Sequence, residues 1–241
     1  MINNECNNKD KFIELLLLNE NKEILIDMYK VGKTEIVEEL LRYNIDVNIQ
    51  DICGNTALIL ASEKGDIEYV ELLLKNGANG NIRNNNGDTA LMLASKNGNK
   101  KCVKLLLIKW VHVDIKNING NSALILASIS GKVECVEELL RYDANLNIKN
   151  NNGNTALILA SLYEYEKCVE LLLKKGADMN IKNKKGNTAL IFAYDNENEE
   201  IVKLLKNHRK DDNIEILNKI NELEDQIKDI MEKLKEIKTF I

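Results

Sequence analysis

The sequence has no proline, two histidines and few aromatic residues. Aromatic residues make up 5% of the 241 positions and hydrophobic residues 44%, so the core must be aliphatic, built from Leu, Ile, Val and Ala. The missing proline, with heavy use of Asn, Lys and Ile, suggests an AT-rich genome and says nothing about function. The formal net charge of −5 is small for this length and argues against a nucleic-acid binder, which should have a basic face.

The sequence also lacks a long apolar run. Residues 1–10 are polar, and the apolar run at 12–18 is short and contains Glu14. This pattern fits neither a secretory signal nor a membrane span. We therefore expect an intracellular, cytoplasmic protein with no membrane partner, and leave open secretion by a route that needs no such signal.

Histidine chemistry is scarce. A His-based triad or a zinc site would need partners that converge on His112 or His208, and nothing in the sequence places such partners beside them. We interpret both as surface histidines. The prediction is that the protein is not an enzyme and has no catalytic residues, no metal site and no cofactor.

One five-residue motif occurs five times in the sequence. It reads Gly-Asn-Thr-Ala-Leu or a close variant, and its glycines stand at 54, 87, 120, 153 and 186, a constant step of about 33 residues. In the unit 51–83, Thr56 is the expected cap of a short helix, Gly65 breaks that helix, and Asp66 is the expected cap of a second one. An Asn-rich hairpin follows. No unit can bury its own apolar faces, so neighbouring units must stack.

This pattern closely resembles the ankyrin repeat family over residues 20 to 209. The resemblance implies an all-α repeat solenoid of about five to six helix–turn–helix units with β-hairpin loops. The expected units are 20–50, 51–83, 84–116, 117–149, 150–182 and 183–209, within a repeat domain of 20–210. Residues 1–19 are expected to form an N-terminal cap, because end repeats must cover an open apolar face.

Some positions depart from the family pattern. The histidine of its Thr-Pro-Leu-His motif is replaced by Ile59, Met92, Ile125, Ile158 and Ile191. Trp110, Asp143 and Glu164 stand at turn positions that are glycine in other units. Asp tolerates the left-handed conformation and Trp does not, so we expect an altered loop at residues 110–112.

Three of the five cysteines occupy one repeat position. Cys102, Cys135 and Cys168 are one unit apart. Stacked helices lie about 8–10 Å apart, beyond the reach of a disulfide. We predict that all three are buried small hydrophobic residues, and that Cys6 and Cys53 are exposed.

Residues 211–241 follow a different pattern. Apolar residues alternate in steps of four and three, the spacing of a coiled-coil seam: Ile216, Ile220, Leu223, Ile227, Ile230, Leu234, Ile237 and Ile241. The sequence predicts a long C-terminal helix that forms a homodimer or homotrimer. The alternatives are that the seam packs on another protein or on the last repeat.

The resemblance implies a protein-interaction module that binds a partner protein through hairpin tips and the concave face of the stack. Most hairpin positions, such as Asn85 and Asn151, we interpret as polar filler. The exposed apolar candidates for partner binding are Ile118, Ile129, Leu162, Tyr163, Tyr165 and Trp110. Two alternatives stay open: an oligomeric scaffold assembled through the coiled coil, and a pathogen or viral effector that engages host proteins.

Overall fold

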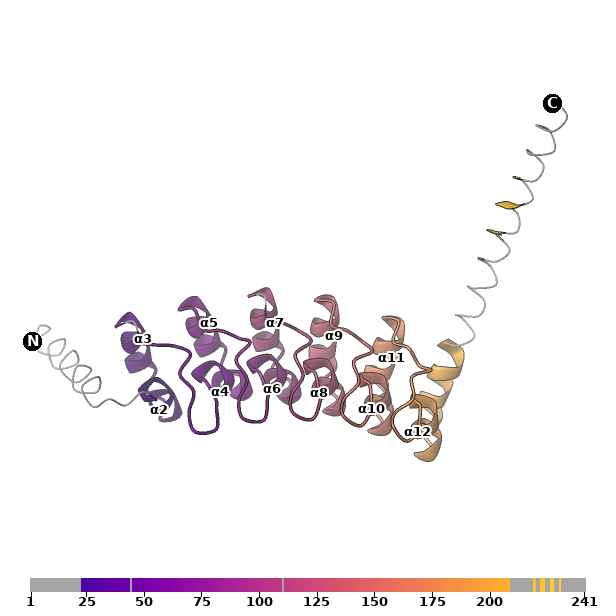
Figure 1. The fold of residues 1–241 in the computed structure, drawn as a ribbon, viewed down its shortest axis with the longest axis horizontal. Coiled ribbons are helices and arrows are strands. Elements are labelled where there is room, and N and C mark those ends of the chain that lie inside the picture. Colours follow the sequence, from indigo (N-terminus) through magenta and orange to yellow (C-terminus); the bar gives the residue numbers. More distant parts are fainter. Residues whose placement is uncertain are drawn as a thin grey trace, which may run out of the picture.

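Pairs of short antiparallel helices stack side by side in two rows (Figure 1). This computed structural model describes residues 23–43, 45–109 and 111–208, together with residues 219, 222, 223, 226, 227 and 230. The labelled helices are α2 (Ile24–Lys30), α3 (Thr34–Arg42), α4 (Ala57–Lys64), α5 (Ile67–Lys75), α6 (Ala90–Asn97), α7 (Lys100–Ile108), α8 (Ala123–Ile129), α9 (Val133–Arg141), α10 (Ala156–Leu162), α11 (Glu166–Lys174) and α12 (Ala189–Asp195). Residues 199–208 are helical and pair with α12. No strand occurs among the described residues.

The first helix of each unit begins at a hydroxyl cap. The Thr56 side chain accepts a hydrogen bond from the backbone N–H of Ile59, at 3.2 Å. Thr89, Ser122, Thr155 and Thr188 do the same for their own helices. Because these oxygens satisfy N–H groups that the helix leaves unpaired, they fix its first turn. The predicted cap at Asp66 is also confirmed, with its carboxylate accepting from the N–H of Tyr69 at 3.3 Å.

A left-handed residue ends the first helix and starts the turn to the second. Gly65 has φ 80°, as expected of a glycine, but Glu164 and Glu197 take the same role with φ 60° and 55°. A side chain in this region costs about 1 kcal/mol. The stack therefore imposes the turn geometry even where the sequence does not favour it.

The core lies between units. Leu58, Leu91, Leu124 and Leu157 are each fully buried, and the first helices α4, α6, α8 and α10 pack on one another in sequence order. The predicted burial of Cys102, Cys135 and Cys168 is confirmed, and Cys53 is exposed as predicted; Cys6 lies outside the described residues. The apolar residues at the family's histidine position are buried inside the stack, from Ile59 to Ile158, and only Ile191 in the last unit is exposed.

The expected distortion at 110–112 is wrong for the described part of that loop. The N–H of His112 donates to Asn81 Oδ1 at 2.8 Å, the same inter-repeat bond that Asn79 makes with Asn48. Val111 fits because it occupies the space that a side chain at Gly80 would need. In later units the larger residue stands at the Gly80 position and the smaller one at the Val111 position. These pairs are Val113 with Ala144 and Leu146 with Ala177. Trp110 itself lies outside the described residues.

Asp143 takes the left-handed conformation at the equivalent turn, with φ 56°. The N-terminal cap expected at 1–19 lies outside the described residues.

Candidate protein-binding surfaces

The hairpin tips project from one side of the stack and are bonded to one another (Figure 1). The N–H of Ile118 donates to the carbonyl of Asn86, and the N–H of Asn151 donates to that of Asn119, both at 3.0 Å. The same bond links Asn85 with Cys53 and Lys184 with Asn152. Because each tip is tied to the preceding one, side chains on the tips are held on a rigid edge.

Asparagine side chains hold these tips together. Asn117 Nδ2 donates to Asp88 Oδ1 of the preceding unit at 2.7 Å, while Asn117 Oδ1 accepts from the N–H groups of Asn119 and Asn121. The equivalent cross-unit bonds are made by Asn84, Asn150 and Asn183. One side chain therefore closes its own turn and fixes its position on the neighbouring unit.

The interpretation of Asn85 and Asn151 as polar filler is wrong. Asn85 Nδ2 donates to the carbonyl of Ile52 at 3.0 Å, and Asn151 Nδ2 donates to that of Ile118 at 2.8 Å. These amides bond each tip to the backbone of the preceding tip. They therefore stabilise the hairpin edge.

Two isoleucines stand on this polar edge. The Ile118 side chain is 59% exposed and Ile52 is 89% exposed, the highest value among the large apolar side chains described. The sequence reasoning singled out Ile118 and passed over Ile52. The signal was available, because the two occupy the same position two units apart.

The remaining candidates lie at the other end of the first helices. Ile129 ends α8 and Leu162 ends α10, and both are partly buried against the core. Ile129 is the last of the seven residues of α8, and this helix, about 10 Å long, lies between the tip at Ile118 and Ile129. The candidates thus form two groups and not one patch.

The two tyrosines beyond α10 differ in their surroundings. Tyr163 is 50% exposed. The Tyr165 ring lies against Gly131 of the preceding unit and lines a cavity of about 390 Å³ with Val133, Glu164 and Glu166. Tyr165 therefore packs between units, whereas Tyr163 is the more available of the pair.

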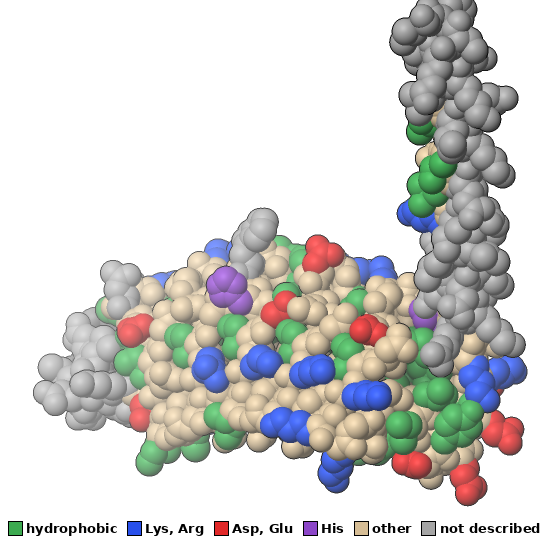
Figure 2. Space-filling model, turned by 45° about the vertical axis from the view of Figure 1, so that its right-hand side comes forward, with side chains coloured by type: hydrophobic (Ala, Val, Ile, Leu, Met, Phe, Trp, Pro, Cys, Tyr) green, Lys and Arg blue, Asp and Glu red, His purple; other side chains and the backbone are tan. Residues whose placement is uncertain are grey.

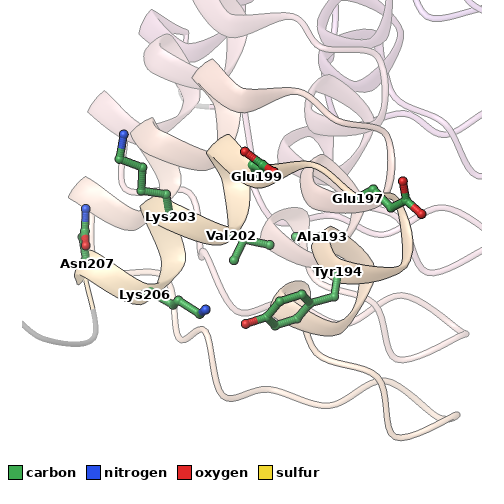
Figure 3. Close-up of a pocket in the computed structure, with 8 residues that line it drawn as sticks. All are labelled: Ala193, Tyr194, Glu197, Glu199, Val202, Lys203, Lys206 and Asn207. Carbon is green, nitrogen blue, oxygen red and sulfur yellow. The ribbon is translucent and has the colours of Figure 1, made fainter.

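A surface that the sequence reasoning missed closes the C-terminal end of the described stack. A cavity of about 610 Å³ opens between α12 and residues 199–208, lined by Ala193, Tyr194, Val202 and charged residues (Figure 3). The Lys206 ammonium lies 5.2 Å from the centre of the Tyr194 ring. At the position of Tyr194 the inner units carry fully buried serines: Ser62, Ser95, Ser128 and Ser161.

The buried thiols are unsuited to nucleophilic chemistry. Burial raises the pKa of Cys135 and of Cys168 to about 11, so neither is a thiolate near neutral pH. His112 is exposed and His208 is half-buried. In the part of the chain that the structure describes, no three His, Cys, Asp or Glu side chains gather as metal ligands would, and no helix is long and apolar enough to cross a membrane.

The structure describes three residues of the predicted C-terminal seam. Leu223, Ile227 and Ile230 are helical, and each is more than half exposed. The other seam residues, Ile216, Ile220, Leu234, Ile237 and Ile241, lie outside the described residues.

Comparison with known families gives the same class as the geometry. The sequence model "Ankyrin repeats (3 copies)" matches residues 25–117 and 107–183, and "Ankyrin repeat" matches residues 185–219. These matches cover more than half of the chain, and the chain belongs to the ankyrin repeat family. Members of this family generally bind other proteins and are generally not enzymes. No curated protein matches the chain.

Proposed function

We propose that this chain is a non-enzymatic protein-interaction module that binds a partner protein through the hairpin tips and the concave face of the stack. The observation that carries the proposal is the exposed position of Ile52 and Ile118 on a hydrogen-bonded edge. Apolar side chains on a rigid frame lose little conformational freedom on binding, which favours affinity. The partner-binding candidates are Ile118, Ile129, Leu162, Tyr163, Tyr165 and Trp110, with Ile52 added.

The proposal includes a cytoplasmic location and a partner that is neither nucleic acid nor membrane. The exposed free thiol of Cys53 supports a reducing compartment. The low net charge of −5 supports a protein partner over a nucleic acid. We retain the division into 1–19, 20–210 and 211–241 as part of the proposal.

Tyr163→Ala tests the binding face. Proteins captured from the native cells by the intact chain are compared with those captured by the variant, and affinity is then measured with the purified partner. Loss of a hot-spot side chain typically costs about 2 kcal/mol, or about thirtyfold in affinity.

Tyr142→Ala is the matched control. Tyr142 is also exposed, at 37%, but it follows the second-row helix α9. If both variants retain the partner equally, or if Tyr163→Ala melts much earlier than the parent, Tyr163 is not part of a binding face.

A second candidate function, an oligomeric scaffold, is favoured by Leu223, Ile227 and Ile230. These helical side chains expose the predicted seam, and a coiled coil between copies would bury it. The repeats would then act as several arms with increased avidity. Sedimentation equilibrium should give a dimer or trimer for the intact chain and a monomer for Ile227→Glu.

Gln226→Glu adds the same charge beside the seam and should leave the oligomer intact, because flanking positions of coiled coils tolerate glutamate. An intact chain that is monomeric at all concentrations would reject the scaffold.

A further inference from the structure

One basic residue recurs at the same position of four successive units. The row consists of Arg83, Lys116, Lys149 and Lys182, and each member directly follows an isoleucine. All four basic residues are exposed. Figure 2 shows basic side chains running from unit to unit along one face, with apolar side chains beside them. We call these four residues the basic row.

Hydrogen bonds show that neighbouring members lie side by side. Lys149 Nζ donates to the carbonyl of Lys182 at 3.3 Å. Gln50, which occupies the same position in the preceding unit, donates through Nε2 to the carbonyl of Arg83 at 3.0 Å. Helices of adjacent units pack about 8–10 Å apart, which sets the spacing of the row.

The charges of the basic row are not neutralised within the described residues. No ion pair joins any of the four to another described side chain, whereas Lys100 and Arg141 on the second-row helices both pair with Glu138. The isoleucines beside the row, Ile115, Ile148 and Ile181, are only partly buried against the core. An apolar strip therefore accompanies a line of cations without an ion-pair partner among the described residues, in a protein whose net charge is −5. Arg83 Nε and Lys149 Nζ each donate only to a backbone carbonyl.

We propose that the basic row binds an extended acidic peptide segment of a partner protein, with a carboxylate at about every third residue. In the extended polyproline II conformation, with three residues per turn and a rise of about 3.1 Å per residue, every third side chain points the same way and recurs after about 9 Å, so it meets one cation per unit. Apolar residues between the carboxylates lie on the isoleucine strip. The inference rests on the proposed function, and it uses a surface distinct from Tyr163.

Nucleic acid fits the row less well. Phosphates of one strand of duplex DNA recur about every 3.4 Å along the helix axis and wind around it, so most of them would face no cation of the row. The spacing of the cations thus favours the peptide.

Fluorescence anisotropy with two synthetic peptides tests the spacing. One peptide carries four glutamates at every third residue, and the other has the same composition with the glutamates adjacent. The spaced peptide should bind more tightly, and increasing salt should weaken its binding. Equal binding of the two peptides, or none by either, overturns the proposal and leaves the Tyr163 test of the proposed function unaffected.

Neutralising the row tests the site. An exposed ion pair is worth up to about fivefold in affinity. The variant Arg83→Gln/Lys116→Gln/Lys149→Gln/Lys182→Gln should therefore bind the spaced peptide at least about tenfold more weakly. The control Lys101→Gln/Lys104→Gln/Lys167→Gln/Lys174→Gln loses the same charge from α7 and α11 and should change binding by less than about twofold.

Circular dichroism establishes that both quadruple variants fold. Equal losses in both would mean that net charge and not the row attracts the peptide. Tighter binding of an oligothymidylate that is lost in the row variant would assign the row to nucleic acid. Tyr163→Ala should leave peptide binding unchanged. If Tyr163→Ala weakens peptide binding, Tyr163 and the basic row belong to one surface, and the proposal of a separate site is overturned.

Discussion

The inner units and the last described unit carry the same five-residue motif, but its apolar side chains are not buried equally in the two. In α10, Leu157 and Ile158 are fully buried. In α12 the equivalent Leu190 is half-buried and Ile191 is 38% exposed. The local sequence is nearly the same, so the difference comes from the neighbours. Burial in this fold belongs to a junction between two units and not to the unit itself.

The last unit is also adapted to its place. Tyr194 replaces the buried serine of the inner units, and Lys206 replaces the leucine represented by Leu173. Both changes put polar groups on one face of the last unit. In the inner units the equivalent face packs against the following unit.

The largest expected effect comes from a charge placed in an inner junction. Leu124→Asp should lower the free energy of unfolding by about 4 kcal/mol, because it removes a buried side chain and leaves a carboxylate without a partner. Leu190→Asp in the last unit should cost about half as much, since its site is partly hydrated. Urea melts of the two variants give the comparison. Equal losses, or a larger loss at Leu190, would contradict the nearest-neighbour account.

Exchanging serine and tyrosine between the inner units and the last unit should have an intermediate effect on stability. Ser128→Tyr should cost about 3 kcal/mol, because a fully buried serine leaves no room for a ring. Tyr194→Ser should change stability by less than about 1 kcal/mol, as it removes an exposed side chain. Thermal melts measure both. A Ser128→Tyr protein as stable as its parent would show that the inner junction can open to accept a large residue.

A smaller effect is expected from the ion network of the second-row helices. The Glu138 side chain is 3% exposed and lies 3.6 Å from Lys100 of the preceding unit and 3.1 Å from Arg141. Glu138→Gln should cost about 1 kcal/mol, because the cations it leaves are half exposed and regain water. Glu137→Gln, at an exposed partner of Arg141, should cost less than about 0.5 kcal/mol. Urea melts at low and high salt should separate the two, and equal costs would mean that burial adds nothing.

Near neutral pH the thiols should differ in chemical reactivity and have no effect on stability. In a Cys6→Ser background at pH 8, iodoacetamide should modify Cys53 alone, as followed by mass spectrometry. Burial raises the pKa of Cys135 and Cys168 from 9.0 to about 11, so the folded state keeps protons that the unfolded state releases. Their stabilising contribution is therefore complete below pH 9 and is lost between about pH 9 and 11. Rapid labelling of Cys135 in the native protein would contradict its burial.

The sequence predicted whatever recurs with the unit. The caps at Thr56 and Asp66, the buried cysteines and the buried apolar residues at the histidine position all follow from the 33-residue step. The sequence did not predict the specific contacts between units. The bonds from Asn85 to Ile52 and the packing of Val111 on Gly80 depend on residues about 30 positions away. Comparison down one column of the repeat would have revealed Tyr194, which departs from the serine of the inner units as Tyr29 of the first unit does.

The asparagine bridge between units has a consequence for how such a protein can change its length. Asn55 meets Asn84, and Asn121 meets Asn150, with the same atoms in the same roles. Removal of residues 84–116 would bring Asn117 to Asn55 and recreate that asparagine pairing, but it would place Ala144 instead of Val111 beside Gly80. Duplication of a unit would also recreate the asparagine pairing. The asparagine bridges are equivalent from unit to unit, so whole units can be added or deleted while these bonds stay the same.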